Sequence, residues 1–589
     1  MNDTAVILRY LYLGTDQPFY IQNKNRALDI EKGCRILAPI RTLVQATSST
    51  DDPATARKLA DNVTLTEPPV KMIVRVMKSG SLVRNDECLF ALAYLARTFT
   101  DAEEKHKVYE AALEVIDESK DLFQFVDFYK KLAPKPGGKG FGHGMRTALT
   151  KWYDKHSAVE LAKLLTTDRS WFGWRHENIL VMIHINLKDD AKMQVLDCAV
   201  GGPGRRKAKP KQTTQKNGSE ENDSGVQLNE KLTNSDGNDN VNVEEDSEAL
   251  KIYRRMKQFK STQTSSMACG PIKQYRYPIQ LVPAQLHRSP AVWESLLPHM
   301  AYRDVVQAAL VLQDYKLLKD NDTPLSIAYG NVLNRMTSVS ESKIHPIFIY
   351  QTMRLFEERQ RYLNVVKEAV HTTNNLALKN ATANPTVLKQ FNCALNHSML
   401  NYKRTGLNFL VTLDLRSKQT KKRVFGNRLM SCQAAFVLLT LPMFKREPHM
   451  TVLSFTEAPH VLTHLDFTRE MTFFQACDHI QSLANKKTKV DITQPIQYAR
   501  QNKKKVDVFI TIVDSLIRVN PNRHSPVVAL NSYNTETKKN AVYIIISLSR
   551  HQQDLDHINM TSTKGVLELV GCTEDTPKLI DAYVKRSFT

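Results

Sequence analysis

A change of pattern at about Leu407 constrains the fold of this chain most strongly. Beyond it, apolar runs of strand length alternate with segments of helical periodicity. The expected strands are 409–415, 450–455, 507–513, 541–549 and 565–570, and the expected helices are 428–444, 473–484, 495–501 and 577–585. Continuous apolar strands separated by helices are typical of a parallel sheet covered on both faces. Residues 405–589 are therefore predicted to form a doubly wound α/β domain.

The chain before this point has helical periodicity only. One expected helix begins with acidic residues from Asp101 onward. Its apolar residues recur at helical spacing and are Tyr109, Ala112, Leu113 and Ile116. Residues 86–97 and 157–165 repeat the pattern, and 302–319 and 347–371 are the clearest later helices. Although no repeat of fixed period is present, stacked helices of this length predict an all-α, HEAT-like solenoid in two parts, 1–200 and 250–404.

Residues 201–249 separate the two helical parts and have a different composition. A basic cluster at 205–211 leads into a mixture of Asn, Ser, Asp, Glu and Lys with almost no large apolar residue. Such a segment buries too little surface to offset the entropy lost on ordering, so we expect a disordered insertion. Its basic start is either a nuclear-localisation or phosphate-binding patch, or simply a solvated run of charge.

The overall charge favours a polyanionic partner. The 589 residues carry a formal net charge of +20 at a sequence pI of about 9.4, a balance also found in ribosomal, chromatin and membrane-surface proteins. The eight cysteines are scattered without a C-x-x-C pair, which argues against a disulfide framework or a zinc module. No apolar run is long enough to span a membrane. We expect a cytosolic or nuclear protein.

A glycine-rich segment at 137–144 begins the first candidate for phosphate contact. Cationic or partly cationic residues occur within this glycine-rich segment and in the helix expected after it. They are Lys139, His143, Arg146 and Lys151. Backbone N–H groups and clustered cations are what phosphate oxygens require. A solvated helix face is the alternative for Lys151, and the adjacent Trp152 and Tyr153 are expected to pack in the core.

A second candidate follows at 169–184. Trp171 and Phe172 lie between Arg169 and Arg175, an arrangement that fits either a stacking platform for bases or a hydrophobic staple before the next helix. His176 is a further candidate for RNA contact, and beyond it His184 stands in the apolar run 179–185. By composition alone, a buried core histidine is favoured there over an RNA contact.

The strand ends of the C-terminal domain hold a third group of polar residues. Asp414, Arg416 and Lys418 follow the first expected strand, and Asp514 follows a later one. This arrangement resembles the von Willebrand factor type A domain, whose metal-ion-dependent adhesion site combines Asp-x-Ser-x-Ser with a Thr and a second Asp. Here Arg416 and Lys418 replace the serines and Val490 falls at the threonine, with Thr488 or Thr493 as alternatives. We expect no metal, with side-chain cations pairing with the aspartates, unless both basic side chains extend into solvent.

Several short motifs make the chain resemble the Ro autoantigen family, whose helical part is the TROVE module. They are 9–14, Gly142-His143-Gly144-Met145-Arg146, Gly173-Trp174-Arg175-His176 and Ile344-His345-Pro346. The resemblance implies a ring of HEAT-like repeats closed by the A-type domain. It implies binding of small noncoding Y-like RNAs on the outer surface and of 3′ ends of misfolded noncoding RNAs in the hole, in RNA quality control.

The resemblance also assigns roles to single residues. His184, eight residues after His176 in the same motif, matches a histidine that the family uses for Y RNA. Two basic family positions fall on Thr167 and Trp171, so a different RNA or a shifted footprint is expected. The family further implies a ribonucleoprotein particle, a monomer and contacts with RNA-processing proteins.

Other classes of function remain as alternatives. We find no nucleotide-binding loop, no nucleophile elbow and no H-E-x-x-H, so the sequence predicts no enzyme and no cofactor. A protein-interaction scaffold, built from the helical solenoid and a metal-free A-type domain, is the main alternative. A metal-dependent adhesion-like or hydrolytic domain is the third.

Overall fold

The computed structural model describes residues 3–21, 27–42, 65–133, 141–201, 246–318, 323–370, 383–416, 420, 422–456, 461–484, 490–514, 525–549 and 565–588, except the side chains of 359–370. Contacts group the chain into two compact units, residues 1–137 with 261–589 and residues 138–260. Among the described residues, no helix combines the length and apolar character needed to cross a membrane. Lys139, Lys418 and most of the expected insertion, 202–245, lie outside these ranges.

The helices of the larger unit follow the predicted pattern closely. Asp101 caps α7 by accepting a hydrogen bond from the Glu104 N–H at 2.9 Å, and α6 is buried from Glu87 to Ala96. Before residue 405, the described helices of this unit are α1 (Asp3–Leu13), α2 (Ile30–Ile36), α5 (Pro69–Lys78), α6 (Asp86–Thr98), α7 (Ala102–Val115), α8 (Ser119–Lys131), α14 (Ser265–Tyr275), α15 (Pro290–Leu296), α16 (Tyr302–Asp314), α17 (Pro324–Leu333), α18 (Met336–Ser342), α19 (Pro346–Val370) and α21 (Pro385–Ser398). Short 3₁₀ turns occupy Ile279–Leu281, Ala284–Arg288, Leu297–His299 and Met399–Asn401.

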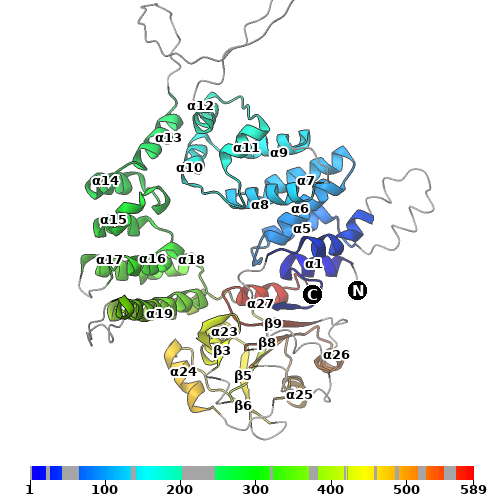
Figure 1. The fold of residues 1–589 in the computed structure, drawn as a ribbon. Helices are drawn as coiled ribbons and strands as arrows, with labels where there is room; N and C mark the ends of the chain where they lie inside the picture. The colour runs from blue at the N-terminus through cyan, green and yellow to red at the C-terminus, as the bar shows by residue number, and fades with distance from the viewer. Residues whose placement is uncertain are drawn as a thin grey trace, which may run out of the picture. The chain divides into compact units, whose positions relative to one another are not determined.

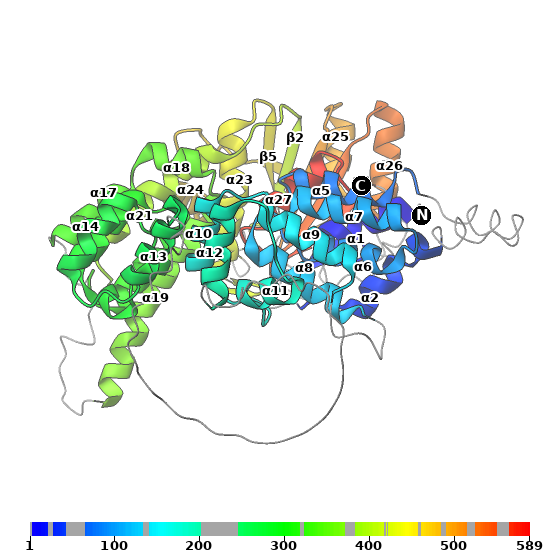
Figure 2. The same cartoon turned by 90° about the horizontal axis from the view of Figure 1, so that it is seen from above.

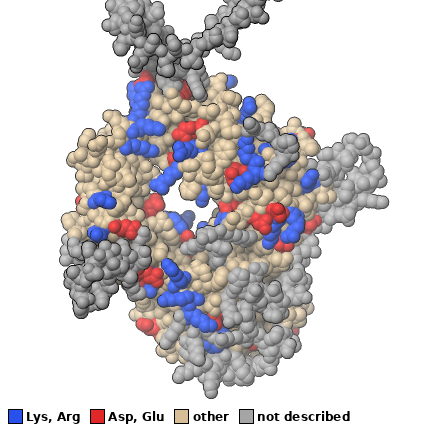
Figure 3. Space-filling view, in the orientation of Figure 1, with Lys and Arg blue, Asp and Glu red and all other residues tan. Residues whose placement is uncertain are grey.

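The smaller unit is helical throughout its described part. Its helices are α9 (His143–Asp154), α10 (Ala158–Thr167), α11 (His176–Ile183), α12 (Asp190–Val200) and α13 (Glu248–Phe259). A capping box between Ser157 and Glu160 fixes the start of α10. Ser247 caps α13, so this helix begins inside the segment expected to be disordered. Lys and Arg gather over α13 in the view of Figure 3.

The C-terminal domain is the predicted α/β fold with a mostly parallel sheet (Figures 1 and 2). The order is β1-β9-β8-β7-β2-β5-β6, and only β6 runs antiparallel to its neighbour. The strands are β1 (Phe19–Ile21), β2 (Phe409–Leu413), β5 (Met450–Phe455), β6 (Leu462–His464), β7 (Val508–Val513), β8 (Val542–Ser547) and β9 (Val566–Val570). Because β2, β7, β8 and β9 are buried along their whole length, they form the centre of the domain's core.

The edge strand β1 was not expected, because residues before 200 were predicted to be helical. Phe19–Ile21 pairs in parallel with Glu568–Val570 of β9. The rings of Tyr12 and Phe588 stack with centroids 4.9 Å apart, and the two chain ends lie side by side in both views. The N-terminal segment thus completes the sheet of the C-terminal domain, a pairing that three residues of local sequence do not signal.

The helix predicted over 428–444 begins later than expected. An antiparallel hairpin, β3 (Arg423–Val424) with β4 (Asn427–Ser431), precedes α23 (Cys432–Arg446), whose cap Ser431 accepts from the Ala434 N–H at 3.1 Å. The later helices are α24 (Phe473–Ser482), α25 (Gln494–Gln501), α26 (Pro526–Thr537) and α27 (Thr576–Val584). Of these, α26 was missed because its residues lack an apolar face of helical period.

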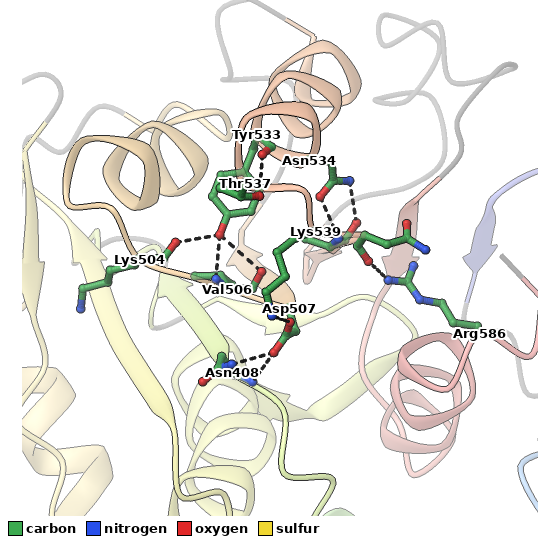
Figure 4. Close-up of polar contacts among 11 residues, drawn as sticks. Asn408, Lys504, Val506, Asp507, Tyr533, Asn534, Thr537, Lys539 and Arg586 are labelled. Atoms are coloured by element: carbon green, nitrogen blue, oxygen red, sulfur yellow. Dashed lines mark hydrogen bonds and ion pairs between the residues drawn. The ribbon is translucent and has the colours of Figure 1, made fainter.

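A polar cluster ties the amino ends of the strands together (Figure 4). Asp507 accepts from Lys539 Nζ at 2.6 Å and from Asn408 N and Nδ2 at 3.1 and 2.7 Å. Nearby, the Tyr533 hydroxyl accepts from the Val506 N–H at 2.7 Å and donates to Lys504 O at 2.7 Å. Burial alone raises the pKa of Asp507, but the Lys539 ammonium and the Asn408 donors outweigh it and hold this pKa below its ordinary value.

Replacement of Asp507 by Asn tests this cluster. Since the pKa of Asp507 is depressed in the folded state, its stabilisation is present above the unfolded pKa and disappears as the pH falls through the folded value. We expect Asp507→Asn to lose about 1 kcal/mol at pH 7, because Lys539 stays partly exposed, and progressively less as the pH falls below about 4. Thermal unfolding against pH measures this difference. Asp581→Asn, at the exposed pair with Lys585, is the control; an effect of Asp507→Asn that persists unchanged in acid would contradict the linkage.

Candidate nucleic-acid interface

The connector between α10 and α11 forms a tight, exposed turn. Trp171 N–H donates to Trp174 O at 3.1 Å, and Trp174 N–H donates to Trp171 O at 2.8 Å. Between them, Phe172 and Gly173 both have positive φ, +54° and +81°. Two consecutive left-handed residues are the mark of the narrow turn that reverses a β-hairpin, and Gly173 supplies one of them without strain.

The turn presents two large aromatic rings to solvent. Trp171 is 43% exposed and Phe172 is 44% exposed, whereas Trp174 packs with its ring centroid 6.2 Å from that of the buried Phe141. Arg169 and Arg175 on either side are exposed. Of the two alternatives for this segment, a hydrophobic staple would bury Trp171 and Phe172. Their exposure fits a stacking surface flanked by cations.

A buried network of hydrogen bonds holds the two ends of this connector together. His176, the first residue of α11, has its Nε2 3.2 Å from Asp168 Oδ2 and its Nδ1 2.9 Å from the Tyr153 hydroxyl. The Asp168 carboxylate can only accept, so Nε2 carries the hydrogen of that bond and Nδ1 accepts from the Tyr153 hydroxyl. Burial raises the pKa of Tyr153 well above its usual range, so its hydroxyl keeps the proton that it donates. The His176 ring also stacks beside Trp152.

This network bears on one expectation about the site. His176 was predicted to contact RNA; in the structure the residue is only 4% exposed and both ring nitrogens are bonded within the protein. It holds the two ends of the connector together through these bonds. The expectation that Trp152 and Tyr153 pack in the core is confirmed, since both are buried.

The other candidates of the smaller unit are exposed. His143, Arg146 and Lys151 project from α9, which begins two residues after Phe141 and therefore close to the turn. His184 ends α11 in the left-handed conformation and is exposed, so the alternative of a core histidine is wrong. The apolar run around it did not reveal this, because the helix ends at Ile183 and leaves His184 outside its buried face.

The crevice of the C-terminal domain lies at the carboxyl ends of the parallel strands, whereas Asp507 lies at the amino end of β7. Asp414 and Asp514 are both fully buried. Arg416 bonds Asp414 with two nitrogens, Nε at 2.8 Å from Oδ1 and Nη2 against Oδ2. Although burial acts to lower the pKa of Arg416, its bond to Asp414 raises it, so the guanidinium stays charged.

The second aspartate has a partner that the sequence did not indicate. Lys422 Nζ lies 2.9 Å from Asp514 Oδ2, and Asp514 N–H donates to Asp414 Oδ2 at 3.4 Å. Lys418 had been expected as the second cation, but it lies outside the described residues, and Lys422 takes this part. Lys422 directly precedes the β3–β4 hairpin, and its carbonyl accepts from the Cys432 N–H at 2.8 Å, just after β4.

The residues present do not fit the divalent cation that A-type domains hold. Two cationic side chains already neutralise the two carboxylates, and Val490 is buried in the hydrophobic core. The Thr493 hydroxyl donates to Asp491 Oδ1 at 2.8 Å. Among the residues that the structure describes, no group of three His, Cys, Asp or Glu is placed to hold a metal. A hard cation requires oxygen ligands whose negative charge is not already neutralised, and the described residues of this crevice offer none.

Removal of Arg416 tests the crevice. Arg416→Ser leaves Asp414 buried without a counter-charge, and we expect it to lose about 3–5 kcal/mol of stability. Lys422→Ser should lose less, since the Lys422 side chain is 39% exposed and water can replace it. In the double variant Mg²⁺ should raise the melting temperature, and in the parent protein it should not. Stabilisation of the parent by Mg²⁺ at millimolar concentration would contradict the assignment.

The network behind the turn has its own test. His176→Ala removes the link between α10 and α11, so trypsin should cleave after Arg169 and Arg175 several times faster than in the parent. Asp168→Ala should act in the same direction. The control is Thr167→Ala, which removes an adjacent hydroxyl bonded only within α10 and to Asp168. Equal cleavage rates in the His176 variant and the parent would show that the turn does not depend on this network.

Comparisons with known proteins match both the C-terminal domain alone and the whole chain. Residues 408–584 match the family described as the Ro60 vWA domain. Over 99% of its length the chain is similar to the RNA-binding protein RO60 of Caenorhabditis elegans, 22% identical over 88% of that protein, and to that of Deinococcus radiodurans, 20% identical over 93%. The crystal structure of the D. radiodurans Ro (Rsr) protein has the same fold, with a TM-score of 0.72 at 18% identity and full coverage of both chains.

Proposed function

Because the chain belongs to the Ro family, we propose that it is an RNA-binding protein of Ro ribonucleoproteins. Its ligands are small noncoding RNAs of the Y type and the 3′ ends of misfolded noncoding RNAs, and its role is RNA quality control in the cytoplasm. The observation that carries this proposal is the exposed Trp171–Phe172 turn with an arginine on each side.

The turn has the properties of a binding surface for unpaired bases. Aromatic rings in solvent offer faces for stacking, and each stacked base contributes about 1–3 kcal/mol. Arg169 and Arg175 supply charge for the phosphates beside those bases. Because the His176 network fixes the backbone on both sides of the turn, RNA binding costs little conformational entropy there.

His184 and the cations of α9 extend the same surface. His184 stands at the far end of the eight-residue helix α11, about 12 Å along its axis from the turn. His143 and Arg146 lie at the start of α9, near Phe141 and the turn. These residues fit contacts on both sides of a stacked base.

The absence of two family cations shifts the expected footprint. Thr167 donates its hydroxyl to Lys163 O at 2.8 Å, and Trp171 presents a ring where the family has a charge. The surface therefore depends more on stacking than the family pattern does. This favours RNAs with unpaired bases near the contact.

Binding of a fluorescein-labelled stem-loop RNA with a single-stranded 3′ tail tests the proposal. We expect Trp171→Ala to weaken binding about 5- to 150-fold, which corresponds to the loss of one stacked base. His184→Ala should weaken it less. Neither change should lower the melting temperature appreciably, because both side chains are exposed. Leu400→Ala, at an exposed apolar residue of the larger unit, is the matched control.

The salt dependence separates RNA binding from a scaffold function. Affinity should fall steeply between about 50 and 200 mM salt, because phosphate contacts release counterions. Undetectable RNA binding, or binding that salt and Trp171→Ala leave unchanged, would favour the protein-interaction scaffold.

A further inference from the structure

Helix α13 carries a cationic face that the candidate site does not include. Its apolar side is buried through Tyr253, Met256 and Phe259. The exposed cations on its other side and at its C-terminal end are Lys251, Arg254, Lys257 and Lys260. Arg254 pairs with Asp246. Among the described residues, no carboxylate lies within ion-pair distance of the three lysines, so their charge is available to a ligand.

Lys257 and Lys260 lie close enough to repel one another. Burial and the charge of Lys257 both lower the pKa of Lys260, and the charge of Glu177 only partly opposes them. The Lys257 ammonium lies 5.5 Å from the centroid of the Tyr253 ring, which keeps it at the helix surface. Two neighbouring ammonium groups that form no ion pair among the described residues lose this repulsion when an anion binds between them.

These two lysines lie beside the ends of the exposed turn. α13 packs on α10, where Thr166 Oγ1 is 3.5 Å from Met256 Sδ, and Thr166 precedes Asp168 by two residues. On the other side, Glu177 of α11 acts electrostatically on both Tyr253 and Lys260, and Glu177 follows Arg175 by two residues. The C-terminal half of α13 therefore lies against the end of α10 and within electrostatic reach of the start of α11, the two helices that flank the connector bearing Trp171. In Figure 3, Lys and Arg cover the place that α13 occupies in Figure 1.

We propose that Lys257 and Lys260 bind backbone phosphates of the RNA whose bases stack on the Trp171–Phe172 turn. They supply from α13 the positive charge that is missing at Thr167 and Trp171. This inference rests on the proposed function and assigns the phosphate contacts of the same surface. It explains how a turn with only two flanking arginines can hold an RNA backbone as well as its bases.

The double variant Lys257→Gln/Lys260→Gln tests the inference with the stem-loop RNA used above. Each lost phosphate contact lowers the slope of log K against log[salt] by about 0.7 for single strands to 0.9 for duplex. We therefore expect a slope smaller by about 1.4–1.8 and, at 0.1 M salt, an affinity about 25- to 60-fold lower. Lys257→Arg/Lys260→Arg keeps the charge and should bind like the parent.

Lys71→Gln/Lys120→Gln is the matched control, since it removes the same charge from exposed positions on α5 and α8. It should leave the slope unchanged. An unchanged slope in the α13 variant, or equal losses in both double variants, would overturn the inference while leaving RNA binding intact. If the parent protein itself does not bind the RNA, the proposed function fails instead. Melting temperatures, together with the charge-retaining variant, separate a loss of contacts from a loss of folding.

Discussion

The hydrogen bonds of His176 are the interaction on which the candidate surface depends. The His176 ring joins Asp168, at the end of α10, to Tyr153 of α9, and His176 is itself the first residue of α11. The connector of seven residues between Asp168 and His176 has no hydrophobic core of its own. Because its two ends are tied at a buried point, it can expose Trp171 and Phe172 without collapsing them onto the surface.

Two buried carboxylates are also paired in the C-terminal domain. Asp414 and Asp514 end two adjacent parallel strands, where a doubly wound fold places its ligand site. Two carboxylates in such a place require positive charge, because buried charges must be paired. In this chain the charge comes from Arg416 and Lys422, so the crevice is a structural link between strand ends and the β3–β4 hairpin. The RNA contacts proposed above lie on the helical unit of residues 138–260.

Much of the architecture was predictable because it follows from local periodicity. The strands β2, β5, β7, β8 and β9 and the helices α6, α7 and α10 begin within one or two residues of the expected positions. For the candidate site, the sequence indicated Arg169, Trp171 and Arg175, because clustered cations and aromatic residues are visible in one dimension, whereas His184 was indicated by the family resemblance alone. It did not indicate Lys257 or Lys260, whose helix follows the low-complexity segment and reaches the turn only through packing on α10.

By itself, the sequence determined the two fold classes, the basic charge and the absence of the A-type serines, since these depend on residue type and spacing along the chain. Only the tertiary structure decided that β1 completes a sheet formed some 550 residues later, that Lys422 neutralises Asp514, and that His176 is buried while His184 is exposed. Each of these depends on which distant segments meet. Such contacts are selected by the packing of whole elements, and local propensity carries no record of them.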